Sequence, residues 1–322
     1  MVNNQNDHEN KDILFHSLST LWLEETKMKV KESTHVKYTN LLKWYINPQL
    51  GSYFLSELNY TVCSRFCMQL LSCFGKNGDG LSEKTASDVL SAVKSIVKYA
   101  TKIGYTPDIS IFSVSVRVQQ KPIRVFSLNE EKRLVNQLDP IKSRYDCGIL
   151  LCLFTGLRIG ELCALKQGDI SLDDCTIHIH KTVQRIQCDG KQTKTKISVD
   201  TPKSFNSVRI IPIPPYLQRY LKKSVPDDAF FLSGEVGKLV EPRVMQAYFR
   251  KTLKACGIYD ASFHTLRHTF ATRCVELGFD IKCLSEILGH ASVNITLNRY
   301  VHPSMDTKRE QMNKLAALLP EQ

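Results

Sequence analysis

Residues 263–270 read Phe-His-Thr-Leu-Arg-His-Thr-Phe, and their apolar positions recur every three or four residues. This spacing predicts a helix whose buried face is formed by Phe263, Leu266, Phe270, Cys274 and Leu277. On a flank of the helix, His264 and Arg267 are three residues apart, so both side chains can donate hydrogen bonds to one anion. His268 is interpreted as a packing residue.

A second polar pair lies earlier in the chain, where residues 155–162 read Thr-Gly-Leu-Arg-Ile-Gly-Glu-Leu. Gly156 is expected to end one helix, and the next helix begins almost at once with Arg158 and Glu161 on one face. An arginine held by a carboxylate at a helix start is suited to binding a phosphate. Taken alone, the pair is more typical of a surface ion pair.

Two further residues follow near the end of the chain. Residues 287–290 read Ile-Leu-Gly-His, so Gly289 is expected to end a short helix and to leave His290 just beyond it. Ser292 then predicts the N-cap of another helix, which carries Tyr300. Singly, neither His290 nor Tyr300 indicates a function, because lone histidines and half-buried tyrosines are common in protein cores.

Positive charge is concentrated in one part of the chain. Lys and Arg outnumber Asp and Glu by 43 to 32, which gives a net charge of +11 over 322 residues. Residues 181–223 alone carry +8 of that excess. Such a segment suits a polyanion, because each neutralised phosphate releases condensed counterions. A merely soluble basic surface is the other interpretation, and charge alone does not decide between them.

The composition excludes several classes of protein. The most apolar run, residues 147–154, is far shorter than the ~20 residues that cross a bilayer. Residues 1–10 are polar and resemble neither a signal peptide nor a transit peptide. The 11 cysteines contain no C-x-x-C pair, so we expect reduced core cysteines in a cytoplasmic protein, and no zinc site.

The first part of the chain, residues 11–104, reads as a helical bundle of about four helices. Apolar residues recur there at helical spacing, with Ser33 and Ser82 as predicted N-caps and Pro48 at a helix end. Residues 105–125 break the pattern and predict an extended linker.

The second domain is expected to cover residues 126–303 and to begin with a capping box at Ser127 and Glu130. Its helices are interrupted by segments with strand character, with Asp189-Gly190 as a hairpin turn. The predicted strands lie at residues 176–180, 195–199 and 208–213. The fold class is therefore mainly α with a small β-sheet, and the basic excess lies on that sheet.

Taken together, four fragments in this order resemble the tyrosine recombinases, or phage-type integrases. They are Thr-Gly-Leu-Arg-Ile-Gly-Glu-Leu, then His-Thr-Leu-Arg-His, then Leu-Gly-His, and finally Tyr300, ten residues beyond His290. The resemblance covers residues 11–322. It implies that residues 11–104 form a SAM-like core-binding domain, which closes with the catalytic domain around duplex DNA.

The resemblance implies a nucleophilic role for Tyr300, which would attack a scissile phosphate and form a 3′-phosphotyrosyl link with release of a 5′-hydroxyl. A phenol with a pKa near 10 needs a base and a positive pocket for this step. His264 would be the base, and Glu161 would orient the first arginine. The phosphate oxygens would be bound by Arg158, Arg267 and His290. The mechanism implies no metal, nucleotide or other cofactor.

In the family, a lysine on a β-hairpin protonates the departing 5′-oxygen. Lys203 matches this position best, while Lys194 and Lys196 lie on the same predicted sheet and remain alternatives. Backbone contacts to DNA are expected from Lys191, Lys194, Lys196 and Arg209.

The expected partners are double-stranded DNA and further copies of the chain. Residues 304–322 carry Met312, Leu315 and Leu319 at helical spacing, and in the family such a tail packs into a neighbouring protomer of a tetramer on paired DNA sites. A tail folded back on its own core is the other interpretation. Because only about ten polar residues precede the first predicted helix, we expect no domain that reads secondary arm sites. DNA-bending and directionality factors are candidate accessory partners, and no membrane partner is expected.

The expected function is the integration or excision of a mobile element. We expect a bacterial protein that associates with the nucleoid when it is bound to DNA. Resolution of chromosome or plasmid dimers uses the same active site, and the sequence specifies neither choice nor the target DNA. A type IB topoisomerase shares the chemistry but not the helical first domain. A DNA-binding protein that had lost catalysis has no use for a reactive tyrosine, and a regulatory helical protein leaves the basic hairpin unexplained.

Overall fold

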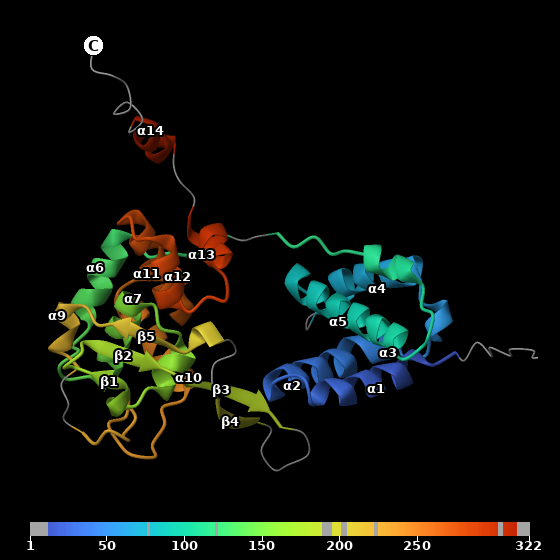
Figure 1. Ribbon diagram of the computed structural model, residues 1–322, viewed down its shortest axis with the longest axis horizontal. Coiled ribbons are helices and arrows are strands. Elements are labelled where there is room, and N and C mark those ends of the chain that lie inside the picture. Colours follow the sequence, from blue (N-terminus) through green and yellow to red (C-terminus); the bar gives the residue numbers. More distant parts are fainter. Residues whose placement is uncertain are drawn as a thin grey trace, which may run out of the picture. The chain divides into compact units, whose positions relative to one another are not determined.

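The computed structural model describes residues 12–75, 78–119, 122–188, 195–200, 205–221, 225–301 and 305–313. The chain forms two compact units, whose helices and strands are labelled in Figure 1. The first comprises Met1–Lys121 with Ile186–Lys196, and the second comprises Pro122–Arg185 with Ile197–Gln322.

The first unit is a helical bundle. Its helices are α1 (Phe15–Lys27), α2 (Glu32–Leu41), α3 (Asn47–Leu50), α4 (Tyr60–Cys73) and α5 (Glu83–Lys102). A π-helical turn (Leu42–Ile46) joins α2 to α3, and 3₁₀ helices follow at Leu55–Glu57 and Ile109–Ser113. The long helix α5 has more buried residues than any other helix of this unit, and Val89, Val93 and Ile96 recur on its buried face.

Of the three local signals predicted for this unit, the structure confirms one. Ser82 caps α5 as predicted, its hydroxyl accepting a hydrogen bond from the Thr85 amide. The prediction for Ser33 is wrong, because α2 already begins at Glu32. Pro48 lies in the first turn of α3 rather than at a helix end, where proline is tolerated because the first helical amides have no partner.

Part of the segment predicted to be a linker packs onto this unit. Ile111 and Val114 are buried in the same core as α5. The ammonium group of Lys94 donates to the carbonyl oxygens of Phe112 and Val114, at 2.8 and 2.6 Å. The chain therefore stays attached to the bundle beyond α5 before it reaches the second unit.

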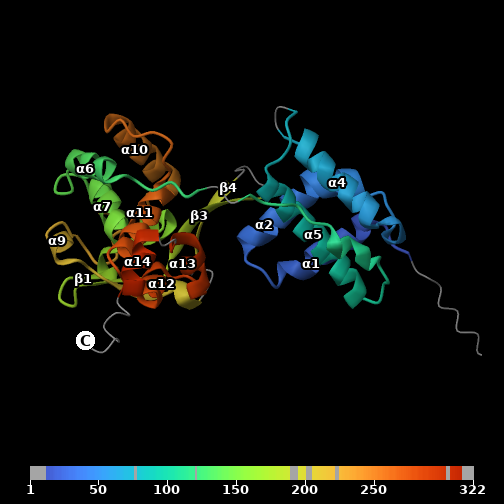
Figure 2. The same cartoon turned by 90° about the horizontal axis from the view of Figure 1, so that it is seen from above.

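The second unit surrounds a nearly completely buried helix, α7 (Arg144–Thr155). This helix holds the most apolar run of the chain, and α11 (Phe263–Glu276) packs against it. In turn, α12 (Ile281–Leu288) and α13 (Val293–Tyr300) pack with α11, as Figure 2 shows. The other helices are α6 (Leu128–Gln137), α8 (Ile159–Ala164), α9 (Pro215–Gln218), α10 (Pro242–Ala255) and α14 (Met305–Asn313), with 3₁₀ helices at Gln167–Asp169 and Phe205–Ser207.

The strands of this region form two small sheets, where one was predicted. The first is antiparallel with the order β1-β2-β5, formed by Ile170–Ser171, Thr176–Ile179 and Arg209–Pro212. The second pairs β3 (Thr182–Gln187) with β4 (Thr195–Asp200). Strand β3 was not predicted, because its buried residues Val183 and Ile186 are three apart and lack the two-residue period of a strand. The predicted Asp189-Gly190 turn lies outside the described residues.

The predicted caps of the second unit are confirmed, and one core residue is corrected. Ser127 and Glu130 form a capping box at the start of α6. Gly156 ends α7 in the left-handed conformation with φ of 67°. Leu277 was predicted to be buried but is 76% exposed, because α11 ends at the preceding residue and the chain turns away at Gly278.

Gly156 should tolerate alanine less well than a comparable glycine of the same unit. A Cβ atom at Gly156 would lie 2.6 Å from Phe270 Cδ1 and 2.8 Å from Leu288 Cδ2, whereas one at Gly278, with φ of 77°, would meet no atom within 4 Å. We expect Gly278→Ala to lower the free energy of unfolding by about 1 kcal/mol, through backbone strain. Gly156→Ala should lower it by about 3 kcal/mol, because overpacking adds to the strain. Urea unfolding measures both, and equal losses would contradict the predicted clash.

Candidate active site

The C-terminal end of α12 is the point at which the site is assembled. Three guanidinium groups donate to the carbonyl oxygens of the successive residues 287–289. Arg209 Nε binds the first at 2.6 Å, Arg267 Nη2 the second at 2.7 Å, and Arg158 Nη2 the third at 3.3 Å. The last carbonyls of a helix lack internal partners and carry partial negative charge, so they are suitable acceptors for cations. One helix end thereby holds arginines from three distant parts of the sequence.

Glu161 places one negative charge within this cluster. Its carboxylate accepts hydrogen bonds from Arg209 Nη1 and Nη2 at 3.1 and 2.9 Å, and from Arg158 Nη1 at 2.7 Å. Burial by itself raises the pKa of Glu161, but the hydrogen bonds and charge of Arg209, followed by the charge of Arg158, lower that pKa to about 2. The carboxylate is therefore ionised at neutral pH. Taken alone, the sequence favours a surface ion pair here. In the structure the Glu161 member of the pair is buried, at 3% exposure.

Arg209 has a different role from the one predicted. It was expected to contact the DNA backbone, but the residue is only 8% exposed. Its guanidinium binds Glu161, the carbonyl of Ile287 and the carbonyl of Ser207. Those contacts occupy the donors inside the protein, so Arg209 links β5 to α8 and α12 and does not present its charge to a ligand.

Arg267 is the most deeply buried arginine of the cluster, at 1% exposure. Besides the α12 carbonyl, it binds the carbonyl of Gly156 through Nη1 at 2.8 Å. Burial, and next the repulsion from Arg158, lower the pKa of Arg267 to about 9. The group still carries its charge at neutral pH. Arg267 thus joins the end of α7, the middle of α11 and the end of α12.

Tyr300 is the last residue of α13, and its side chain points into this cluster. The residue is 6% exposed, and its ring lies parallel to the His290 ring at 6.4 Å between centroids, with 4° between the planes. The Tyr300 hydroxyl lies 2.9 Å from Nδ1 of His268. Burial raises the pKa of Tyr300, while the charges of Arg267, Arg299 and Arg158 oppose that increase. The phenol is therefore protonated at neutral pH.

The histidines around Tyr300 are neutral at pH 7. Burial, followed by the charges of Arg267 and Arg158, lowers the pKa of His290 to about 3. Nδ1 of His290 forms a 2.8 Å hydrogen bond with the buried Thr296 hydroxyl. Desolvation, followed by nearby cationic side chains, lowers the pKa of His264 to about 4 although the residue keeps an exposed surface. Desolvation and the proximity of His264 lower the pKa of His268 to about 4.

The structure brings together most of the residues predicted from the sequence. Arg267, His290 and Tyr300 lie in one cluster with Arg158 and Glu161. His264 lies one turn before His268 on α11, with 4.5 Å between the ring centroids. The phenol is hydrogen bonded to Nδ1 of His268, a residue predicted to serve only in packing. Its spacing of four residues from His264 was the signal that places it on the same helix face.

Of the predicted lysines, Lys196 is the one among the residues that the structure describes. Lys203, Lys191 and Lys194 lie outside the described residues. Lys196 lies on β4, and its ammonium is 2.7 Å from a carboxylate oxygen of Glu32.

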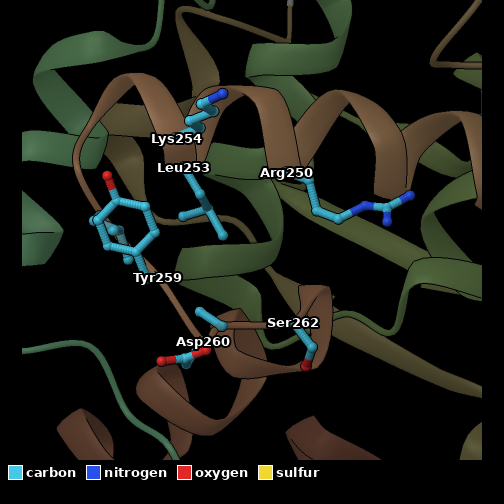
Figure 3. A pocket seen from close by; sticks show the side chains of 8 residues that line it. Arg250, Leu253, Lys254, Tyr259, Asp260 and Ser262 are labelled. Atoms are coloured by element: carbon cyan, nitrogen blue, oxygen red, sulfur yellow. The ribbon is translucent and has the colours of Figure 1, made fainter.

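A separate cavity of about 420 Å³ opens at the end of α10. Figure 3 shows Arg250, Leu253 and Lys254 projecting from that helix, while Tyr259, Asp260 and Ser262 come from the segment before α11. None of the residues around Tyr300 lines it. Among the described residues, no helix is long and apolar enough to cross a bilayer, and no cluster of three metal-binding side chains occurs.

Comparison with known families gives a match over most of the chain. The phage integrase family matches residues 124–307, and the phage integrase N-terminal SAM-like domain matches residues 14–71. A tyrosine recombinase XerC-like protein of Caldanaerobacter subterraneus subsp. tengcongensis is 27% identical and aligns over 91% of this chain and 80% of its own. The integrase of Staphylococcus phage L54a is 24% identical over 99% of this chain and 97% of its own.

Solved structures share the fold. The Tn1549 transposon integrase in complex with transposon right end DNA superposes with a TM-score of 0.78 at 22% identity, covering 94% of this chain and 100% of that one. A lambda integrase tetramer bound to a Holliday junction gives a TM-score of 0.63 at 16% identity, covering 89% and 80%.

His290 should make stability depend on pH in the acid range. Its pKa is about 3 in the folded protein, while an unfolded histidine titrates near 6.5, so the unfolded chain binds one more proton between these values. Stability therefore falls as the pH is lowered from 7 to 5, with each such histidine contributing about 1.4 kcal/mol per pH unit. His290→Gln should reduce the slope of the unfolding free energy against pH by about 1.4 kcal/mol per pH unit, which corresponds to one proton. This change in slope is expected whatever the effect of the substitution on stability at pH 7. Urea unfolding at several pH values measures this, and an unchanged slope would mean that His290 is protonated in the folded protein.

Proposed function

The chain belongs to the phage integrase family, the tyrosine recombinases that cut and rejoin DNA strands, and we propose that it integrates or excises a bacterial mobile element through Tyr300. The names of its relatives support a mobile-element role, since they include a phage integrase and transposase A from transposon Tn554. The similarity to XerC-like recombinases favours a second candidate, the resolution of DNA dimers by the same chemistry.

The observation that carries the assignment is the position of the Tyr300 hydroxyl beside fixed positive charge. Arg267 and Arg158 are held by the end of α12, and their charges act on the phenol. Groups fixed in advance stabilise a transition state without reorganising during the reaction. In the proposed mechanism the two arginines bind the non-bridging oxygens of a phosphodiester, and Tyr300 attacks the phosphorus.

The histidines would complete the phosphate site. His290 lies parallel to the Tyr300 ring and is held by Thr296, so it is placed to donate to the same phosphate. His264 lies on α11, one turn from Arg267, and is proposed as a further group acting on that phosphate or as a proton acceptor. The product is a 3′-phosphotyrosyl bond and a free 5′-hydroxyl. Rejoining reverses these steps, so the bond energy is kept and no nucleotide is consumed.

The departing 5′-oxygen needs a proton, and we assign Lys203 as its donor, with Lys194 and Lys196 as the alternatives. Lys203 precedes Arg209 by six residues in the segment that leads into β5. Arg209 begins β5 and binds Glu161, so Lys203 is six positions in sequence from a residue of the arginine cluster. Lys191 and Lys194 are proposed as contacts to the DNA backbone.

Recombination requires two DNA sites. We therefore propose that the protein acts as a tetramer on paired sites in the bacterial cytoplasm. Accessory DNA-bending or directionality factors are proposed as further partners. The lambda integrase tetramer on a Holliday junction has the same fold. Helix α14 supports an exchanged tail, because Met305 and Met312 on it are 61% and 64% exposed.

A covalent adduct in EDTA is the direct test of the nucleophile. Purified protein is incubated with nicked duplexes tiled from the DNA that flanks its gene, and denaturant-resistant adducts are resolved by electrophoresis. We expect an adduct with the wild type and none with Tyr300→Phe, because only the phenolic oxygen forms the ester. An adduct that survives in Tyr300→Phe would show that another residue is the nucleophile.

Exchange of the tail predicts that Leu315→Asp disrupts assembly but not binding. Leu315 lies beyond α14, outside the described residues. The variant should bind a single site normally and lose the tetramer on paired sites, since a buried charge opposes docking in an apolar groove. Asn313→Asp adds the same charge at an exposed position of α14 and serves as the control. Sedimentation of the DNA complexes distinguishes them, and a Leu315→Asp tetramer as stable as the wild type would exclude the exchange.

A further inference from the structure

His268 is in direct contact with the reacting atom, although the mechanism above gives it no role. Its Nδ1 lies 2.9 Å from the Tyr300 hydroxyl oxygen, with 5.8 Å between the ring centroids. His268 directly follows Arg267 on α11, a helix anchored against the buried α7. Its ring also packs edge-on against that of His264, with 83° between the two ring planes. The nitrogen that faces Tyr300 is therefore held by the same rigid helix as the arginine.

The direction of this hydrogen bond follows from the groups around the phenol. Arg267 and Arg158 act on the Tyr300 oxygen as cations, and a guanidinium can only donate a hydrogen bond. The phenolic proton must then point to an acceptor. His268 is neutral at pH 7, because burial and nearby cationic side chains disfavour its charged form, so one ring nitrogen keeps a lone pair. Nδ1 is the ring nitrogen that lies within hydrogen-bond distance of the phenol.

We propose that His268 positions the Tyr300 nucleophile by accepting its hydroxyl proton in a hydrogen bond at Nδ1, and that it takes this proton during strand cleavage. This inference rests on the proposed function. As the bond between the Tyr300 oxygen and phosphorus forms and the bond to the 5′-oxygen breaks, the phenolic proton moves to Nδ1 of His268. The 5′-oxygen receives a different proton, from the proposed lysine. The bound phosphodiester and its developing charge lie beside the arginines and offset the new charge on the imidazole.

Two substitutions distinguish the roles of the two ring nitrogens of His268, Nδ1 and Nε2. In His268→Asn the amide oxygen replaces Nδ1 in position, whereas in His268→Gln the amide reaches the position of Nε2. The asparagine still accepts a hydrogen bond but does not take up a proton. We measure the single-turnover rate of adduct formation on nicked duplex at saturating concentration, together with the dissociation constant for the same DNA.

We expect His268→Gln to lower the adduct rate by about 10²-fold or more at pH 7, with the dissociation constant unchanged within about twofold, because general bases typically contribute 10²–10⁴. His268→Asn should lose less rate. The rate of His268→Asn should rise between pH 7 and pH 9, because the phenol must then lose its proton to solvent. The wild-type rate should stay constant over the same range. Equal rates and equal pH profiles for the two variants, or a His268→Gln rate close to that of the wild type, would overturn the proposal.

A measurement on the free protein separates this inference from the proposed function. Tyrosine labelled with ¹³C at Cζ reports the hydrogen bonding and the ionisation of each phenol by NMR, and Tyr300→Phe identifies the Tyr300 signal. We expect His268→Gln to shift this signal and His268→Asn to leave it near the wild-type position. Unchanged Tyr300 signals in both variants would refute the contact, whether or not the wild type forms adducts. Conversely, a missing wild-type adduct with the expected shifts would leave the contact established and reject the proposed function.

Discussion

The end of α12 is the constraint on which the second unit depends. Its terminal carbonyls bind three arginines that come from the start of α8, from β5 and from α11. A helix end carries roughly half a negative charge, and that is too little to balance three cations. Glu161 adds one negative charge from a buried position, and breaking such a network leaves uncompensated charge in a low-dielectric interior. The geometry of the site and the stability of the unit therefore rest on the same contacts.

This arrangement leaves the site with an excess of positive charge, which explains the other electrostatic features. The three histidines are neutral because nearby guanidinium groups and burial both disfavour a further cation. The phenol of Tyr300 is protonated because burial outweighs the attraction of the arginines. A phosphodiester brings the missing negative charge. Binding of DNA and activation of the nucleophile are, in this view, two consequences of one charge imbalance.

The sequence predicts the fold where local chemistry decides the structure. The caps at Ser82 and Ser127 and the helix ends at Gly156 and Gly289 follow from residue type alone, because each supplies a conformation or a hydrogen bond that few residues provide. Strand β3 was missed because its buried residues do not alternate, and its pairing with β4 depends on tertiary contacts.

The site was predictable in its parts but not in its connections. Spacing along a single helix predicts that Arg158 lies beside Glu161 and, on another helix, that His264 lies beside Arg267. No local pattern indicates that Arg209 turns inward to the same carboxylate, since that contact joins residues 48 positions apart. The contact of His268 with Tyr300, 32 positions away, likewise depends on how α13 packs on α11.

The burial of Tyr300 has a consequence for the integrity of the DNA. A phosphotyrosyl ester can be attacked by a 5′-hydroxyl, which restores a continuous strand, or by water, which leaves a break in the chromosome. At 6% exposure the proposed nucleophile, Tyr300, lies among packed rings and guanidinium groups, where little solvent reaches it. A positioned strand end then competes with few water molecules. If Tyr300 forms the proposed ester, the same packing that makes the phenol hard to ionise also limits hydrolysis of that ester.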